Sequence, residues 1–188
     1  MTRLGWMLLL GFALVIAIFA ALVRHGRAPV GVRTPAPAPV AAAGGLVVPV
    51  AGVKITQLAD SWGDARGGGT RAHHAIDIPA AKGTPVVAAA AGTVEKLFES
   101  KDGGHTVYIR RDDTSWQDYY AHLDTYTADL REGVRIRQGQ PIGTVGSSGD
   151  ADPSAPHLHY EIQRMAPGEP WWKGSEINPF PILAHSAS

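Results

Sequence analysis

The stretch "APHLHYEI" (residues 155–162) decides how the rest of the sequence is read. His157 and His159 stand one residue apart at the start of a run that is typical of a β-strand. Successive side chains of a strand point to opposite faces, so both imidazoles are expected on one face, with Tyr160 and Ile162 on the other. Two titratable rings side by side on a sheet either cap a polar surface, share a metal site or share a catalytic role.

The composition of the 188-residue chain restricts its chemistry. It contains no cysteine, which excludes disulfides, thiolate zinc sites and cysteine nucleophiles, so His, Asp or Glu must hold any transition metal. The chain has 17 basic and 17 acidic residues, but the first 50 residues hold four arginines and no acid. Residues 51–188 therefore have 13 basic and 17 acidic residues, a net charge of −4. Without a basic run, no nucleic-acid partner is expected for this part.

The N-terminal segment is strongly apolar. Residues 5–23, "GWMLLLGFALVIAIFAALV", form 19 residues without a charge. About 20 apolar residues cross a bilayer as a helix, so we expect residues 1–25 to be an uncleaved transmembrane signal-anchor. A cleaved signal peptide and a buried helix are the alternatives. The first has an apolar core of only ~7–15 residues and ends in a small-x-small site, and no clean Ala-x-Ala follows here.

The next segment is low in complexity. Residues 26–45 are rich in Pro, Ala and Gly and show no periodic apolar face. This composition indicates a semi-extended linker. Residues 46–188 are left as the folded domain.

The fold class follows from short apolar runs that alternate with Gly and Pro. These runs are typical of strands or strand edges, and no stretch after residue 46 has a long helical period, which predicts a mainly β fold. They cover residues 46–55, 73–79, 84–98, 105–111, 116–123, 134–146 and 157–163. Residues 83–97 and 133–149 also share a Gly-to-Gly-Thr-Val pattern, which suggests two related hairpin corners.

A second histidine motif lies in "RAHHAIDIPA" (residues 71–80). His73 and Asp77 are four residues apart, a spacing that keeps both on one face of a strand or a helix. Imidazole and carboxylate are common zinc ligands, and one histidine of the 157/159 pair would complete three protein ligands with a fourth position left for water. The alternative is a surface hydrogen bond between His73 and Asp77. His74 is the neighbouring histidine that competes with His73 for this role.

The last histidine motif is "YYAHLD" (residues 119–124), which places His122 on a strand-like run. Taken alone, His122 is as consistent with a solvent-exposed strand edge as with a catalytic role. Nearby aromatic side chains either line a groove or belong to the core. They are Trp62, Trp116, Tyr119 and Tyr120.

The motifs occur in a diagnostic order. "HHAIDIPAAKGTPVVAAAAGTV", "YYAHL", "IRQGQPIGTVGSSG" and "PHLHYEI" follow one another along the chain. Together they resemble the LytM/lysostaphin-type zinc metallopeptidases, whose usual pattern is His-x-Gly-x-Asp, then Tyr-Ala-His-Leu, then His-Leu-His-Phe/Tyr-Glu. The resemblance covers residues 52–182 and implies the antiparallel β-sheet groove of that family.

The resemblance implies roles for single residues. His73, Asp77 and His159 align with the zinc (Zn2+) ligands, and His122 and His157 align with the two catalytic histidines. Two departures are visible. Ala75 stands where the family usually has Gly, and the loop "GSSGDADPSAP" (residues 146–156) is longer and more polar than usual. The second departure bears on substrate fit rather than on metal binding.

The implied function is a zinc-dependent endopeptidase that hydrolyses peptide bonds in bacterial peptidoglycan cross-links or stem peptides. The expected location is the cell envelope, with the chain anchored in the cytoplasmic membrane and the peptidase domain outside the cytoplasm. One alternative is a non-catalytic LytM-like module that activates other wall hydrolases through envelope protein partners. Another is a carrier domain of the sugar phosphotransferase type, which is cytoplasmic and does not need the apolar span.

Overall fold

The structure is a computed structural model of the chain, and it describes residues 45–186. The expected signal-anchor (1–25) and all but the last residue of the expected linker (26–45) lie outside the described residues. Between residues 45 and 186, no helix has the length and apolar character needed to cross a bilayer. The anchor and the linker therefore stay predictions.

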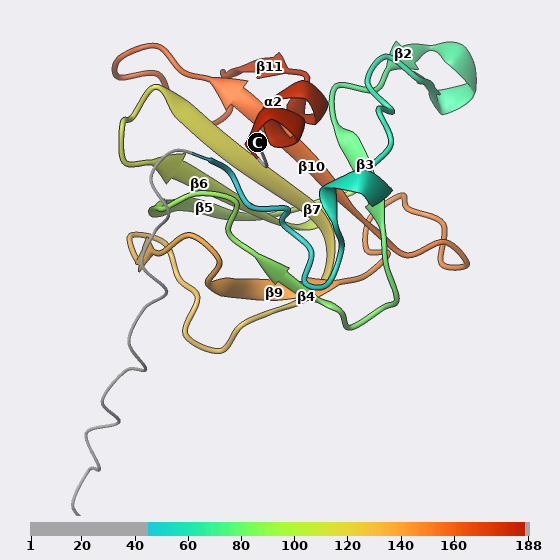
Figure 1. Cartoon of the computed structure of the whole chain (residues 1–188), viewed down its shortest axis with the longest axis horizontal. Coiled ribbons are helices and arrows are strands. Elements are labelled where there is room, and N and C mark those ends of the chain that lie inside the picture. The colour runs from blue at the N-terminus through green and yellow to red at the C-terminus, as the bar shows by residue number, and fades with distance from the viewer. Residues whose placement is uncertain (1–44, 187–188) are drawn as a thin grey trace, which may run out of the picture. The chain divides into compact units, whose positions relative to one another are not determined.

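The domain is built around a nine-stranded antiparallel sheet (Figure 1). Its main path runs through six strands, and β10 and β7 lie beside each other near its middle. In order, these strands are β11 (Ser175–Ile177), β10 (His157–Arg164), β7 (Trp116–Tyr126), β6 (Gly104–Arg111), β5 (Gly92–Ser100) and β8 (Arg135–Ile136). The other three are β3 (Ile76–Pro79), paired with β10, β9 (Pro141–Val145), paired with β7, and β4 (Pro85–Val87), paired with β9. The prediction of a mainly β, antiparallel fold is confirmed.

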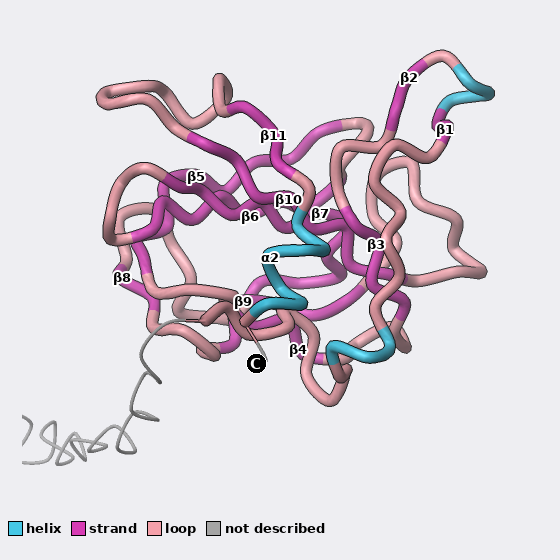
Figure 2. The backbone as a smooth tube through the Cα atoms, turned by 45° about the horizontal axis from the view of Figure 1, so that its top comes forward, coloured by secondary structure: helices cyan, strands magenta, loops and turns pink. Residues whose placement is uncertain are grey.

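Several short elements were not predicted from the sequence. A hairpin of β1 (Ala65–Arg66) and β2 (Arg71–Ala72) extends beyond β3 in both views (Figures 1 and 2). Helix α2 (Pro179–His185) starts at Asn178, whose side chain accepts a hydrogen bond from the backbone of Phe180. The remaining elements are the 3-10 turns η1 (Ile55–Gln57) and η2 (Gly67–Gly69). All are too short to produce a periodic apolar pattern.

Two strand predictions need correction. In residues 46–55, Val50 forms an isolated bridge to Val86, and Pro49 and Ala51 hydrogen bond to the neighbouring residues of β4 at 2.9 and 3.0 Å. Pro49 cannot donate to a ladder and Gly52 has a left-handed φ of 79°, so the run forms only a short strand edge beside β4 and then turns. The two similar segments, 83–97 and 133–149, do not form separate hairpins. Instead, the strands of one segment pair with those of the other: β4 pairs with β9, and β5 pairs with β8.

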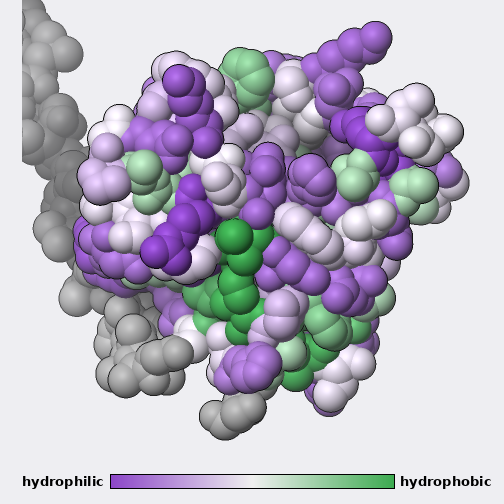
Figure 3. All heavy atoms as spheres, turned by 90° about the horizontal axis from the view of Figure 1, so that it is seen from above, coloured by the Kyte–Doolittle hydropathy of each residue, from purple (hydrophilic) through white to green (hydrophobic). Residues whose placement is uncertain are grey.

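Strand alternation separates the core from the opposite face of the sheet. On β10, Leu158, Tyr160 and Ile162 are fully buried, while the residues between them are only partly buried. Leu183 of α2 belongs to the same apolar cluster, so the helix covers the core side of the sheet. The view in Figure 3 shows mainly hydrophilic side chains around a central apolar strip. The apolar core therefore lies on one face of the sheet, and the histidines of β10 lie on the other face.

Strand β7 changes partners along its length. Residues up to Ala121 pair with β10, and residues from Leu123 onward pair with β9. Between them, β7 has one residue more than β6, because Tyr120 lies opposite Val107 and Leu123 lies opposite His105. This is a β-bulge at His122, whose φ is 58°. A left-handed φ is uncommon outside glycine, so the bulge fixes the direction of this histidine.

A buried ion pair joins two central strands beneath the core. Asp118 is fully buried and accepts two hydrogen bonds from Arg111, at 2.9 Å from Nε and 2.5 Å from Nη2, and a third from the hydroxyl of Tyr160 at 2.7 Å. Burial alone would lower the pKa of Arg111, but its hydrogen bonds to Asp118 raise it above the usual value. Each charged group therefore needs the other to compensate for the hydration that it loses on burial.

We expect Asp118→Ala to lower the free energy of unfolding by about 3–5 kcal/mol, because it leaves the Arg111 guanidinium buried without its carboxylate. The control is Asp112→Ala, which breaks the exposed Arg135–Asp112 pair (2.6 Å) and is expected to cost less than about 1 kcal/mol. Urea unfolding of both variants measures the difference. Equal costs at the two sites would contradict the buried-pair assignment.

Candidate metal centre and active site

Strand β10 lies between β3 and β7 and thereby brings three parts of the chain together. His159 is paired with Asp77 of β3 on one side and with Ala121 of β7 on the other. Residues directly opposite in an antiparallel pair share a face, so His159 and Asp77 point to the same side. His157 points to this side as well, as expected from the spacing of two. The sheet therefore puts both histidines of "HLH" beside the carboxylate.

His73 reaches the same place from a loop rather than from a strand. It precedes β3, and its backbone forms two hydrogen bonds with the segment 61–64: His73 N to Asp64 O at 2.9 Å, and Gly63 N to His73 O at 2.8 Å. Its side chain is only 3 % exposed. His73 and Asp77 do face each other, with 3.1 Å between Nε2 and Oδ1, but His73 lies before β3 and not on the strand or helix that the spacing predicted. The loop before β3 turns the ring toward the carboxylate instead.

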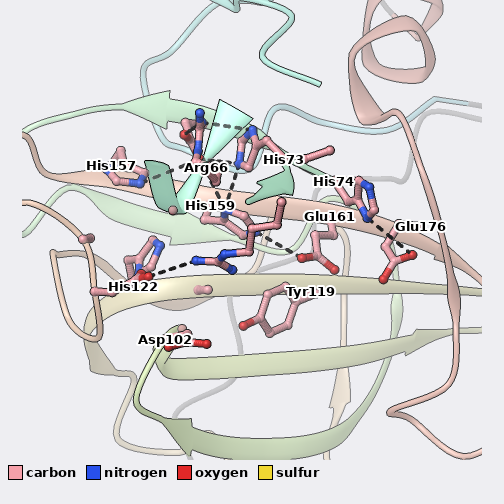
Figure 4. A pocket seen from close by; sticks show the side chains of 18 of the residues that line it. Arg66, His73, His74, Asp102, Tyr119, His122, His157, His159, Glu161 and Glu176 are labelled. Carbon is pink, nitrogen blue, oxygen red and sulfur yellow. Dashed lines mark hydrogen bonds and ion pairs between the residues drawn. The ribbon is translucent and has the colours of Figure 1, made fainter. Parts of the chain in front are cut away.

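Three side-chain atoms converge at this point (Figure 4). His73 Nε2 lies 3.1 Å from Asp77 Oδ1 and 3.1 Å from His159 Nδ1. His159 Nδ1 lies 3.3 Å from the same Asp77 oxygen. These three residues form a cluster whose ligand atoms all lie close enough together for one metal ion.

Hydrogen bonds to the outer nitrogens leave the inner ones free to bind a metal. His73 Nδ1 lies 2.9 Å from the carbonyl oxygen of Ser61, to which it donates when protonated. His159 Nε2 lies 3.1 Å from Glu161 Oε1 and donates in the same way. Glu161 is itself positioned by Gln163, whose amide donates to its second oxygen at 2.8 Å. Such outer partners fix the tautomer and the orientation of metal-binding histidines.

The charges of the cluster are strongly coupled. Burial raises the pKa of the Asp77 carboxyl, but the close polar contacts and charges of the His159 and His73 rings outweigh it and hold the pKa well below its usual range. Burial would lower the pKa of His159, yet its close contact with Asp77 and its hydrogen bond to Glu161 raise it to about 9. Without a metal, a proton on His159 therefore neutralises the carboxylate at neutral pH.

The donor set fits a zinc ion. Asp77 Oδ1 is buried and has no hydrogen-bond partner, although it faces two imidazole nitrogens. A tetrahedral site with bonds of about 2.0–2.1 Å separates neighbouring ligand atoms by about 3.3 Å, close to the separations seen here. Two neutral imidazoles and one carboxylate form a recognised donor set for catalytic zinc, which keeps a fourth position open. The residues present therefore suit this metal.

His122 and His157 lie next to the cluster but are not part of it. Their ring centroids are 5.0 Å apart, and the His122 ring lies 5.5 Å from that of His159. The backbone amide of His122 donates to Gly103 at 2.9 Å, and its Nδ1 lies 2.8 Å from the carbonyl oxygen of Ser148. The Nδ1 of His157 lies 2.9 Å from the carbonyl oxygen of Ala155. In both rings, a proton on Nδ1 leaves Nε2 available.

Burial also sets the charge of His122. It lowers the pKa of this ring below 6.5, and the hydrogen bond to Ser148 only partly offsets that effect. His122 is therefore neutral at pH 7 and able to accept a proton.

The cluster opens into a cavity of about 600 Å³. Its walls are the β1–β2 hairpin, the turn at residues 102–103 and the loop at residues 150–152. Tyr119 forms part of the floor, and its ring packs against the ring of Tyr108, with 4.6 Å between the ring centroids. Tyr120 is fully buried in the core. Of these two neighbouring tyrosines, Tyr119 therefore lines the groove and Tyr120 belongs to the core.

The remaining sequence candidates lie outside the metal cluster. His74 is exposed, stacks on Trp62 at 5.3 Å and lies 4.0 Å from Glu176 across the cavity wall. Trp116 packs against the core and beneath Arg111. His74 is therefore not one of the clustered residues. Its position leaves His73, and not His74, as the candidate ligand.

Several residues of the site were missed in the sequence. Glu161 lies two residues after His159 on the same strand face, a signal that was available. The sequence contains no such signal for Ser61, Arg66 or Ser148, because each lies in a loop or hairpin whose path depends on the rest of the fold. Ser61 Oγ also accepts a hydrogen bond from the backbone N–H of Asp77 at 3.0 Å, so one residue positions two members of the cluster.

The fold and site together define a metallopeptidase-like domain, and comparison with known families agrees. The model of peptidase family M23 matches residues 71–179. The chain belongs to this family. The matched region holds all three residues of the cluster and both neighbouring histidines.

Curated relatives support the same grouping. The chain is 37% identical over 129 residues to an L-Ala--D-Glu endopeptidase of Bacillus subtilis, a match of 65% of this chain and 38% of the relative. It is 42% identical over 95 residues to peptidoglycan DD-endopeptidase ShyC of Vibrio cholerae, covering 50% of this chain and 21% of the relative. It is also 31% identical over 128 residues to the murein hydrolase activator NlpD of Escherichia coli, covering 68% and 29%. The chain thus matches well under half of each relative's length.

Solved structures share the fold. A glycyl-glycine endopeptidase LytM from Ruminococcus gnavus, described as putative, has a TM-score of 0.58 at 32% identity and covers 69% of this chain and 53% of that chain. The catalytic domain of lysostaphin from Staphylococcus simulans has a TM-score of 0.55 at 26% identity, covering 68% and 91%. The LytM/lysostaphin-like fold expected from the sequence is confirmed.

The charge state of His159 leads to a pH prediction. Because its pKa is raised to about 9 in the metal-free protein, a metal must displace a proton from this ring at neutral pH. Apparent zinc affinity is therefore expected to rise with pH, by up to about tenfold per unit, and to level off above about pH 9. Competition titrations with a chromogenic chelator from pH 6 to 9 measure this slope. An affinity independent of pH across that range would contradict the assigned charge state.

Proposed function

We propose that this chain is a zinc-dependent endopeptidase that hydrolyses peptide bonds in bacterial peptidoglycan cross-links or stem peptides. In this proposal, His73, Asp77 and His159 bind the metal, and His122 and His157 act on the substrate. The observation that carries the proposal is Asp77 Oδ1, which is buried without a hydrogen-bond partner between two imidazole nitrogens. A buried carboxylate oxygen in this setting favours a cation over a purely structural role.

The two neighbouring histidines supply proton transfer and stabilisation of developing charge. Zinc bound at this site would act as a Lewis acid that lowers the pKa of water and polarises a carbonyl group. His122 is neutral and its Nε2 is unprotonated when Nδ1 donates to Ser148, so it takes the proton of the attacking water. His157, in its protonated form, donates from Nε2 to the developing negative charge on the carbonyl oxygen.

The proposed substrate follows from the relatives and the groove. The relatives from Bacillus subtilis and Vibrio cholerae are named as endopeptidases, the latter acting on peptidoglycan. The cavity carries charged and polar side chains on both walls, which can bind the polar groups of a peptide.

The proposed location extends the same reasoning to the N-terminal segments. Residues 1–25 would anchor the chain in the cytoplasmic membrane, and residues 26–45 would separate the domain (46–188) from it. The domain would then face the cell envelope. Membrane fractionation of the full chain tests this, and recovery in the aqueous fraction after high-salt washing would contradict an uncleaved anchor.

Variants of the two histidines on β10 separate metal binding from catalysis. We expect the full chain to bind one zinc ion and to cleave purified peptidoglycan in a chelator-sensitive way. His159→Ala should lose both zinc and activity, because it removes a ligand. His157→Ala should keep the zinc and lose about 10²–10³-fold in rate, because it removes only the donor to the developing negative charge on the carbonyl oxygen. Metal analysis and amine release from peptidoglycan measure the two properties.

His74→Ala provides the matched control. His74 is the histidine adjacent to His73 but points to Glu176 and Trp62, so its zinc content should equal that of the wild type. Loss of zinc in His74→Ala, or full zinc content in His159→Ala, would contradict the ligand set.

A non-catalytic activator is the second candidate function. The similarity to NlpD-type murein hydrolase activators supports it. The filled set of five positions argues for catalysis instead. Incubating the metal-loaded chain with peptidoglycan alone, and then with a purified wall hydrolase, separates the two. Cleavage only in the second mixture, unchanged by His157→Ala, would favour the activator.

A further inference from the structure

Arg66 extends from the β1–β2 hairpin into the metal cluster (Figure 4). Its Nη2 donates to Asp77 Oδ2 at 2.6 Å, the shortest polar contact described here for that carboxylate. Its Nη1 donates to the backbone oxygen of Ala65 at 3.4 Å and lies 3.9 Å from Asp64. The side chain is one-third exposed, so it forms a wall of the cavity rather than part of the core.

The two oxygens of Asp77 therefore have different surroundings. Oδ2 is occupied by the Arg66 guanidinium. Oδ1 faces His73 Nε2 and His159 Nδ1 and has no hydrogen-bond partner. A carboxylate binds zinc through one oxygen or through both, and the second mode adds a ligand. The contact with Arg66 leaves only one oxygen free.

We propose that Arg66 is a positioning residue that restricts Asp77 to one-oxygen coordination and so preserves an open position at the metal. The proposal rests on the proposed metal site. Arg66 acts through Asp77 and does not touch the reacting groups. A site with three single-atom donors keeps its fourth position for water or substrate, whereas chelation by both Asp77 oxygens would fill or distort it.

A second contact of Arg66 depends on the tautomer of His73. Nη2 lies 3.1 Å from His73 Nδ1, which also lies 2.9 Å from the carbonyl oxygen of Ser61. An arginine N–H donates only to an unprotonated Nδ1. Metal binding through Nε2 needs the proton on Nδ1, where it is donated to Ser61. In that state, Nη2 of Arg66 donates to Asp77 alone.

The direction of the metal-affinity change separates positioning from simple charge. A guanidinium near a dication repels it, so removing that charge alone would tighten metal binding. Removing a partner that orients a metal ligand weakens binding, typically by about 10–100-fold. The proposal requires the second result.

Arg71 provides a matched control on the same hairpin. It has the same charge, but its guanidinium donates to Asp150 at 3.2 Å and is 57% exposed. It has no described contact with the carboxylate of Asp77. Arg71→Met and Arg66→Met therefore remove the same charge from neighbouring strands, and only the second removes the contact with the cluster.

The experiment uses the full 188-residue chain, as wild type and as Arg66→Met, Arg66→Lys and Arg71→Met. Zinc affinity is measured by chelator competition, and coordination by the visible absorption of the Co2+-loaded protein, which weakens as the coordination number rises. For Arg66→Met we expect a zinc Kd about 10–100-fold higher and weaker cobalt absorption. Arg66→Lys keeps a cationic donor and should recover part of both properties. Arg71→Met should stay within about twofold of the wild-type Kd because its charge is exposed and screened.

Two results would overturn the proposal: unchanged or tighter zinc binding with an unchanged cobalt spectrum in Arg66→Met, or an equal loss in Arg71→Met. Tighter binding would leave Arg66 only a charge effect on the metal, and unchanged binding would leave it no role. An equal loss in Arg71→Met would assign the loss to the hairpin as a whole. If the wild-type chain binds neither zinc nor cobalt, the proposed metal site itself fails. A wild-type chain that binds both metals, with Arg66 variants that match it, removes only the role of Arg66.

Discussion

The whole site depends on the register of β10 against its two neighbours. His159 lies opposite Asp77 on β3 and opposite Ala121 on β7. A shift of one residue would turn His157 and His159 into the core and bring Leu158 and Tyr160 to the groove. Burial of the apolar set is therefore what fixes the position of the polar set. The metal chemistry is a consequence of packing on the opposite face of the same strand.

The bulge in β7 brings a further imidazole, that of His122, to the site. Regular alternation would direct His122 to the core, because Asp118 and Tyr120 already point there. The extra residue reverses the alternation, so that Leu123 is buried and His122 lines the cavity. A non-glycine residue with positive φ costs about 1–3 kcal/mol, which the surrounding strands must outweigh. The local strain is thus located at a residue proposed to transfer protons.

Outer contacts give each ring its tautomer. Ser61, Glu161 and Ser148 accept from nitrogens that do not face the cavity, and Arg66 occupies one oxygen of Asp77. All but Glu161 lie in loops or in the short hairpin. Their sequences contain no periodic pattern, so nothing short of the folded chain relates them to the histidines. Arg66 is the clearest case, since eleven residues and a hairpin separate it from the carboxylate it contacts.

The sequence by itself determined the fold class, the shared face of His157 and His159, and the four histidines and one aspartate that meet at the site. Alternation along a strand and the order of the motifs are properties of the chain alone. Only the tertiary structure decided that His73 arrives from a loop, that His122 turns outward at a bulge, and that Arg66 contacts Asp77. Each of these depends on contacts between distant segments, whose free energy is set by packing and register rather than by local residue preference.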